Sequence, residues 1–136
     1  MMKQFLFGLF FILISLTSIS QANHSITDPE LRFKQAKEHF VEGDYALAYP
    51  LVKELLDKYS DNKGYSYLLE DSKYFYIVCG LKLLQETSSD DAIVYINSIT
   101  NDPRKQLLSF HLAHYYFLKA DYQHAIEYYD LAGYDN

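Results

Sequence analysis

Cysteine is almost absent from this chain of 136 residues, because Cys79 is the only one. A single thiol cannot close a disulfide within the chain, even in an oxidising compartment. Cys79 stands beside Gly80 in an apolar stretch, and no neighbouring cation would lower its pKa. We therefore expect a small buried hydrophobe rather than a reactive thiol, with intermolecular pairing as the alternative.

Clustered positive charge is also lacking. The chain has 12 Lys and Arg residues against 18 Asp and Glu residues, a formal net charge of -6, and its lysines are scattered. Nucleic acids and anionic membrane surfaces are bound by clustered Lys and Arg. This composition argues against both kinds of partner.

Catalytic motifs are missing too. The sequence has no G-x-x-x-x-G-K-[ST], H-E-x-x-H, G-x-S-x-G or Cys-x-x-Cys. His111 and His114, with His124 further on, are the residues that could bind a metal, because two histidines three apart share one helix face. No carboxylate on the same helix completes that set. We interpret the pair as solvated or hydrogen-bonded and expect no cofactor and no enzyme activity, with a metal-dependent enzyme using His111 and His114 as the alternative.

The longest apolar run, Phe5 to Leu16, is too short to cross a bilayer comfortably. It follows a start that carries Lys3, and it precedes small residues at Ser20 and Ala22, as in a secretory signal peptide. We predict a signal peptide over residues 1–22, cleavage after Ala22 and a short polar leader over residues 23–28. The protein would be exported, to the periplasm, the cell envelope or the medium, and an uncleaved membrane anchor is the alternative.

The stretch from Leu112 to Ala132 predicts two helices packed tightly together. Its small residues, Ala113 and Ala125, would be the points of close contact, and Asp121 stands where the second helix needs an N-cap. The pattern repeats 77 residues earlier, where the matching residues are Ala36, Phe40, Gly43, Asp44, Tyr45 and Ala48. A weaker middle copy has Gly80 and Ala92 as its small residues and Ile96 as a large one, with Ser88–Asp91 supplying the turn and the cap.

This spacing resembles the tetratricopeptide repeat (TPR), whose helical hairpins stack side by side. The resemblance implies an all-α fold, an α-solenoid of about three TPR-like hairpins behind the signal peptide. We place a TPR-like domain at 29–136, with repeats at about 29–62, 73–105 and 106–136 and an insertion at 63–72. Its implied function is that of a non-catalytic protein-interaction module or scaffold, resembling exported bacterial TPR proteins.

Local signals set the expected helix boundaries. Asp28–Pro29 and Asp102–Pro103 each place an N-cap before a proline at the first helical position, although Thr27 and Glu30 could form a capping box instead. We expect a helix from Tyr45 to about Tyr59 that continues past Pro50 with a slight kink. A longer helix should run from about Tyr65 to Gln85, and the β-branched stretch Ile93 to Ile96 should be helical.

The resemblance also implies a concave groove lined by the first helix of each hairpin. Its positions here are Phe33, Lys37, Phe40, Ile77, Leu81, Leu84, Phe110, His114 and Phe117. Lys37 is the only lysine among them, so an apolar or aromatic peptide or helix suits this groove better than an acidic C-terminal tail. The alternative is that these side chains only pack helix against helix.

The sequence ends at Gly133–Asn136, soon after Tyr128 and Leu131. We expect one apolar flank of the last helix to be uncovered. Self-association, a docked partner or a longer repeat protein of which this is the N-terminal part would each account for it.

Overall fold

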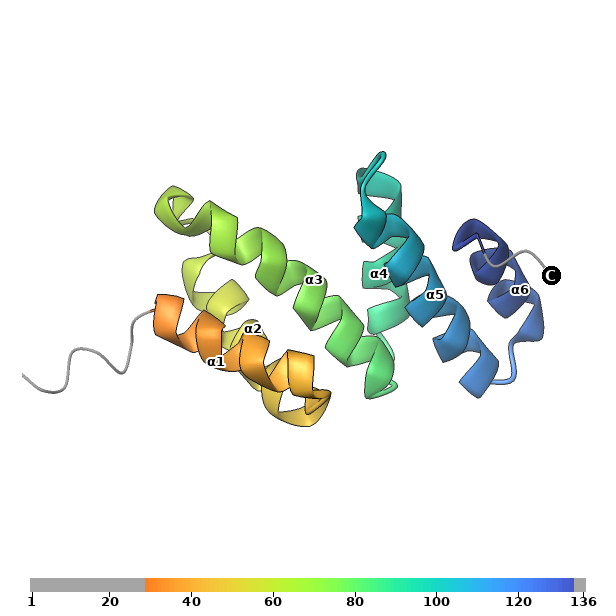
Figure 1. Ribbon diagram of the computed structural model, residues 1–136, viewed down its shortest axis with the longest axis horizontal. Helices are drawn as coiled ribbons and strands as arrows, with labels where there is room; N and C mark the ends of the chain where they lie inside the picture. Colours follow the sequence, from red (N-terminus) through yellow and green to blue (C-terminus); the bar gives the residue numbers. More distant parts are fainter. Residues whose placement is uncertain (1–28, 134–136) are drawn as a thin grey trace, which may run out of the picture.

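The computed structural model describes residues 29–133, and the regular elements in this part of the chain are all helices. The prediction of an all-α fold is therefore confirmed. The elements are α1 (Pro29–Glu42), α2 (Tyr45–Tyr59), the 3₁₀ turn η2 (Lys63–Tyr65), α3 (Ser66–Lys82), α4 (Ser88–Ser98), α5 (Pro103–Leu118) and α6 (Tyr122–Leu131). They form an elongated row with α1 and α2 at one end and α6 at the other (Figure 1).

The predicted signal peptide and leader, residues 1–28, lie outside the described residues. Within residues 29–133, every helix is too short or too polar to span a bilayer.

Two of the predicted N-caps form. The Asp102 side chain accepts a hydrogen bond from the Arg104 backbone N–H at 2.8 Å, with Pro103 opening α5, and Asp121 accepts one from the His124 N–H at 3.3 Å. Asp44 also precedes its helix, but its side chain makes no capping bond. The prediction that Asp44 caps α2 is corrected accordingly.

The turn before α4 also differs from the prediction. The helix begins at Ser88, its N-cap residue is Thr87, and no side chain caps it. Asp90 and Asp91 lie in the first turn as expected, where negative charge opposes the helix dipole favourably. Ser88 is instead fully packed against Gly80 of α3, so it contributes to packing rather than to a cap.

The expected helix boundaries agree closely with the structure. Helix α2 continues through Pro50 to Tyr59, and α4 is helical across Ile93 to Ile96. Residues 63–72, predicted as an insertion, form η2 and the start of α3. The third hairpin begins at Pro103, three residues before the predicted boundary at 106, because the Asp102 cap starts the helix there.

Helix α3 is the centre of the molecule, and it packs against α1, α2, α4 and α5. Successive residues on a helix point about 100° apart. The consecutive aromatics Tyr74, Phe75 and Tyr76 therefore reach three different neighbours. Their ring partners are, in order, Tyr95 of α4 at 6.3 Å, Phe40 of α1 at 4.2 Å and Tyr49 of α2 at 4.9 Å.

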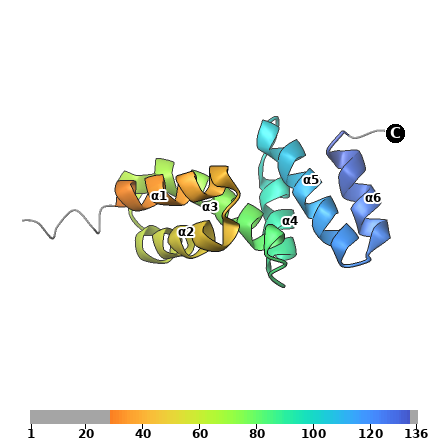
Figure 2. The ribbon, with the colours of Figure 1, turned by 60° about the horizontal axis from the view of Figure 1, so that its bottom comes forward.

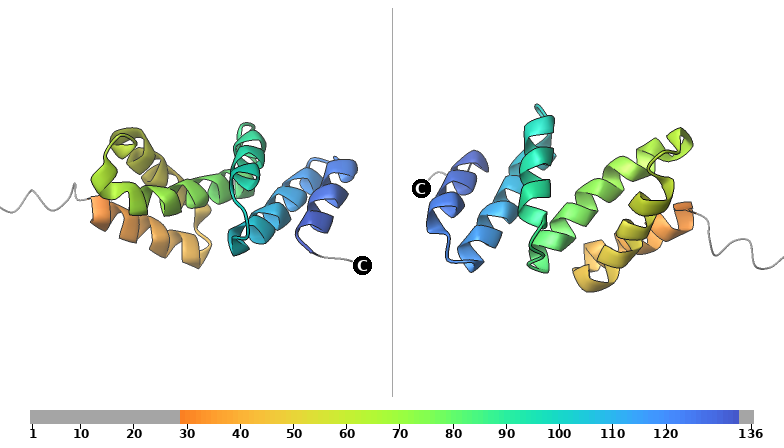
Figure 3. Two further views of the ribbon diagram at one scale, coloured as in Figure 1. Left: turned by 90° about the horizontal axis from the view of Figure 1, so that it is seen from above. Right: turned by 180° about the vertical axis from the view of Figure 1, so that it is seen from behind.

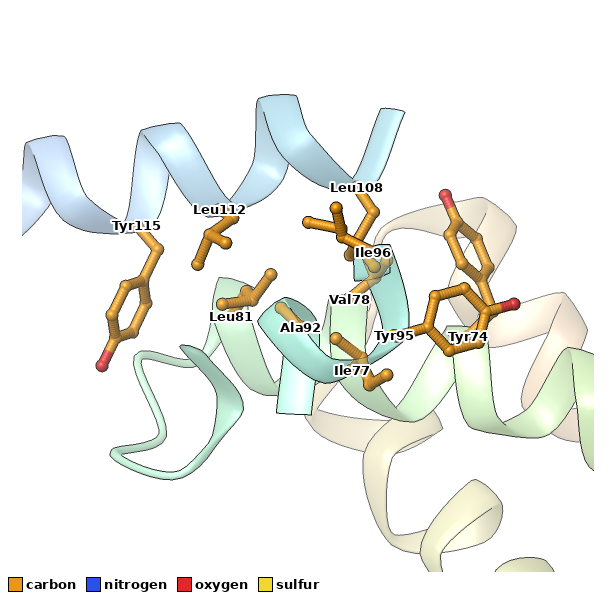
Figure 4. Packing of buried hydrophobic residues seen from close by; sticks show 10 residues of the cluster. All are labelled: Tyr74, Ile77, Val78, Leu81, Ala92, Tyr95, Ile96, Leu108, Leu112 and Tyr115. Carbon is orange, nitrogen blue, oxygen red and sulfur yellow. The ribbon is translucent and has the colours of Figure 1, made fainter. Parts of the chain in front are cut away.

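The core lies where α3, α4 and α5 meet. Figure 4 shows Val78 and Leu81 of α3 pointing toward Leu108 and Leu112 of α5, and Ala92 and Ile96 of α4 belong to the same cluster. Helix α4 crosses the C-terminal end of α3 rather than following its whole length (Figure 3). It packs on α3 less extensively than α1 packs on α2. The middle hairpin is therefore more open than the two beside it.

Small residues hold the outer hairpins together as predicted. Ala36 and Ala48 in the first hairpin are fully buried, as are Ala113 and Ala125 in the last. The chain reverses between the paired helices through positive φ angles at equivalent positions, 82° at Gly43 and 60° at Ala120.

Candidate partner-binding surface

A half-buried aromatic face lies between α1 and α3. We define the aromatic face as Phe33, Phe40 and Phe75. The Phe75 ring stacks on Phe40 with centroids 4.2 Å apart and on Phe33 at 5.8 Å. Lys37 lies on α1 between the two phenylalanines and is exposed. The face therefore presents partly accessible aromatic rings beside one cation.

The helical periodicity of α1 and the packing of α1 beside α3 determine where these rings lie. Phe33, Lys37 and Phe40 are four and three residues apart, so they share one face of α1. Figure 2 shows α1 running alongside α3, which places Phe75 opposite that face. Phe40 is held further by an edge-to-face contact with Tyr45, at 5.8 Å between centroids.

Charged and aromatic groups tie α3 to α4 and α5 beside this face. The Arg104 guanidinium donates a hydrogen bond to Asp71 and lies over the Tyr74 ring at 5.3 Å from its centroid. Burial raises the pKa of Tyr74 to about 12, so its hydroxyl stays protonated. A hydrogen bond from the guanidinium to Tyr95, together with Asp71, raises the pKa of Arg104. Arg104 therefore keeps its positive charge near neutral pH, and it links α5 to Asp71 and Tyr74 of α3.

The predicted groove residues on α5 are partly accessible. Phe110 is half-buried against Tyr129 of α6, with ring centroids 5.7 Å apart. The His114 ring lies nearly parallel to that of Phe117 at 6.4 Å, and Phe117 is 51% exposed. These three side chains form a separate group from the aromatic face on α1 and α3.

Of the three groove residues predicted on the middle hairpin, two are buried and the third, Leu84, is 39% exposed. Ile77 and Leu81 are each only 2% exposed and pack in the core between α3, α4 and α5. Helix α3 has neighbours on several sides, and the side that carries Ile77 and Leu81 is covered by α4 and α5. Leu84 lies beyond the end of α3, in a loop where its φ angle is 56°.

Sequence reasoning missed Phe75, Tyr74 and Arg104. The available signal was the run Tyr74–Phe75–Tyr76, because three adjacent aromatics on a helix cannot all face the same neighbour. The TPR-like register assigned only one side of this helix to a groove and did not consider the others.

His111 is largely buried on α5, and its Nδ1 atom has no hydrogen-bond partner. Burial lowers the pKa of His111 to about 4, and the charges of Lys82 and His114 act in the same direction. The imidazole is therefore neutral near pH 7. Within residues 29–133, no third ligand joins His111 and His114 in a metal-binding group.

A different trio of possible metal ligands lies at the turn between α1 and α2. His39, Glu42 and Asp44 each offer one ligand atom, and these atoms lie within 4.8 Å of one another. Gly43, with a φ angle of 82°, reverses the chain and returns Asp44 toward His39. Mixed imidazole and carboxylate ligands suit a first-row divalent cation. The two carboxylates are exposed to solvent on this turn.

Cys79 is fully buried in α3, and burial raises the pKa of its thiol to about 12. A protonated, inaccessible thiol is neither a nucleophile nor a metal ligand. The expectation of a small buried hydrophobe is confirmed.

No known family model, no curated protein sequence and no solved structure matches this chain. Its functional interpretation therefore depends on its own residues.

Proposed function

We propose that this protein is a non-catalytic interaction module, an α-solenoid of TPR-like hairpins that binds an apolar or aromatic peptide or helix. The aromatic face is the observation that carries this proposal. Phe33, Phe40 and Phe75 present stacked, half-buried rings next to the exposed Lys37. Aromatic side chains supply large contact area, and phenylalanine is among the residues enriched at the cores of protein interfaces.

The internal repetition of the chain supports the solenoid. Residues 77 positions apart have the same role in the first and last hairpins, since Ala36 and Ala113 are both buried and Gly43 and Ala120 both have positive φ angles. Two helical hairpins of the same design on either side of the middle pair, α3 and α4, agree with a short array in which each repeat packs on its neighbours.

The ligand class follows from the charge of the face. Lys37 is the lysine on this side of α1, and the rings around it are apolar. A carboxylate-rich tail would find one cation, whereas an apolar or aromatic segment would find three rings. A single acidic group on the ligand, placed near Lys37, would set its orientation.

Peptide selection tests this proposal. The full chain is immobilised and used to select from a random 12-residue peptide display library, and the enriched peptides are measured against variants. We expect enrichment of aromatic and aliphatic residues, with binding weakened by Phe33→Ala and by Lys37→Glu. Gln35→Ala is the matched control, because Gln35 is also exposed on α1 but is two residues from both Phe33 and Lys37 and so does not share their helix face. Lys37→Glu replaces an exposed side chain, so it tests binding without loss of packing.

Two results would contradict the proposal. One is the absence of any enriched peptide. The other is enriched peptides that bind all three variants as well as they bind the original protein, while circular dichroism shows the helices intact.

Export is part of the proposal and follows from the sequence of residues 1–22. A module of this kind would act in the periplasm, in the envelope or outside the cell. Mass spectrometry of the protein from its own cells should find an N-terminus at Asn23. An intact Met1 in the membrane fraction would replace this part of the proposal with an anchored protein.

A further inference from the structure

The second helix of each hairpin carries a stripe of large side chains at spacings of three and four residues. On α2 the stripe begins Tyr45 and Tyr49, and on α6 the residues 77 positions later are Tyr122 and Ile126. Residues at such spacings share one helix face. We define the α6 stripe as Tyr122, Ile126 and Tyr129.

In the first two hairpins, the first helix of the next hairpin covers this stripe. Tyr49 stacks on Tyr76 of α3 at 4.9 Å, and the two hydroxyls are hydrogen-bonded at 3.1 Å. On α4, Ile96 is buried in the core cluster together with Leu108 of α5. In both hairpins, therefore, the element that packs on the stripe is a helix, α3 on α2 and α5 on α4.

On α6, within the described residues, no further helix covers Tyr122 and Ile126, while Tyr129 is half-buried against Phe110 of α5. Tyr122 is 58% exposed and Ile126 is 61% exposed. Figures 1 and 2 show α6 at the end of the row, with α5 on one side of it and no helix on the other. Phe117 meets Tyr122 edge-on at 5.7 Å and extends the apolar surface onto α5. Of the residues that the sequence suggested for this flank, Leu131 is exposed, whereas Tyr128 stacks on Tyr116 and is half-buried.

We propose that the α6 stripe binds an amphipathic helix of a partner protein whose contact face resembles that of α3. On α3 the contact consists of Tyr76 and, four residues later, Gly80. A Cβ atom at Gly80 would lie in ordinary contact with the Tyr49 ring, at 3.5 Å, so a residue no larger than alanine fits against that ring. Lys82 then lies over the Tyr45 ring, with Nζ 6.0 Å from its centroid. The bound helix would carry an aromatic residue, a small residue four positions on and a flanking lysine.

The charge beside the stripe favours a partner over a second copy of this chain. Glu127 and Asp130 are exposed on α6 next to the stripe, and the chain carries a formal net charge of -6. A helix with flanking lysines complements these carboxylates. In the first hairpin, the lysine at the matching place is Lys82 of α3, which lies over the Tyr45 ring. Two copies meeting through α6 would bring the same carboxylates toward each other, which is unfavourable. This surface is separate from the aromatic face, so the two can be tested independently.

A synthetic helix tests the proposal. The probe is a labelled peptide with the sequence of α3, Ser66–Lys82, carrying Cys79→Ser, and its binding to the full chain is followed by fluorescence anisotropy. Ile126→Asp should weaken binding at least about tenfold, which corresponds to roughly 1.4 kcal/mol. Val41→Asp, at an exposed position on α1, should leave binding unchanged. A peptide with Gly80→Leu should bind weakly, because the larger side chain would hold the helix away from Ile126, the equivalent of Tyr49.

Ile126 is largely exposed, so its replacement should leave the thermal melt unchanged, and Tyr122→Ser provides a second, milder variant. Equal binding by the Ile126→Asp variant, or no binding to the original protein, would overturn the proposal. Sedimentation showing a dimer of the original chain that Ile126→Asp abolishes would also overturn it, in favour of a second copy as the occupant. This test is independent of the aromatic face. If the display library yields no peptide whose binding depends on Phe33 and Lys37, the result with the α3 peptide still stands.

Discussion

Individual small residues decide how closely the helices approach in this protein. Ala36, Ala48, Ala113 and Ala125 are all buried, and Gly80 is packed directly against Ser88. A small residue at a helix crossing lets the backbones come together, and any added atom there must displace a neighbour. These positions are therefore sensitive to enlargement, although they carry almost no side chain.

Gly80→Ala should destabilise the protein by about 1–3 kcal/mol, because its Cβ would overlap Ser88 Oγ and lie 3.0 Å from Ser88 Cβ. Urea denaturation measures the free energy of unfolding. Gly64→Ala is the matched control, since its Cβ would meet only the exposed Asn62 side chain at 3.2 Å. Adding Ser88→Gly to Gly80→Ala should recover part of the loss. Equal stability of the two alanine variants would show that α3 and α4 are not in close contact there.

His111 should make stability fall in mild acid. Its pKa is about 4 in the folded protein against an ordinary value of 6.5, so the unfolded chain binds the proton more readily. The stabilisation is complete above pH 6.5 and is lost as the pH falls toward 4, amounting to about 2 kcal/mol for a partly exposed ring. Urea unfolding at several pH values should show a smaller loss for His111→Gln over this interval. Parallel curves for the two proteins would exclude this role.

At the scale of the elements, similar sequence patterns produce turns with different interactions. Asp44 and Asp121 precede the second helix of the first and third hairpins, and both follow a residue with a positive φ angle. Asp121 caps its helix and also pairs with the His124 ring at 2.7 Å. Asp44 makes no cap and lies 4.0 Å from His39, on the preceding helix. The helical start signal was visible in the sequence, whereas the partner of each carboxylate depended on nearby side chains.

Asp121→Ala should lower the melting temperature more than Asp44→Ala does. The first substitution removes both an N-cap bond and the pairing with His124, and the second removes only a long contact with His39. Differential scanning calorimetry of the two variants at pH 6 measures the difference. The pKa of His124 is raised by Asp121, so the effect of Asp121→Ala should shrink as the pH rises and the imidazole loses its proton. A larger effect at Asp44 would contradict the observed capping.

At the scale of the whole molecule, burial is distributed unevenly along the row. Helix α3 contributes eight buried residues and packs against four other helices, while α6 contributes Ala125 alone. Local stability follows buried contacts, so the centre and the end of the row should open at different free energies. The uncovered α6 stripe lies on the less stable end, where a bound helix would add the contacts that α3 provides for α2.

Hydrogen exchange should reveal this gradient. Backbone amides of α3 should exchange most slowly and those of α6 most rapidly, with α5 between them, when the full chain is followed by mass spectrometry at neutral pH. Binding of the α3 peptide should slow exchange in α6 and leave α1 unchanged. Uniform protection across all six helices would mean that the molecule opens only as a unit.

The sequence by itself determined the all-α class and most helix boundaries, because these depend on local chemistry. Helical spacing of apolar residues, the Asp102–Pro103 start and the tolerance of Pro50 act within a turn or two of the chain. The burial of the small residues also followed from the 77-residue repetition. Only the tertiary structure decided that Ile77 and Leu81 belong to the core rather than to a groove. Their surroundings depend on α4 and α5 packing against α3, and such contacts between distant segments cannot be read from the periodicity of one helix.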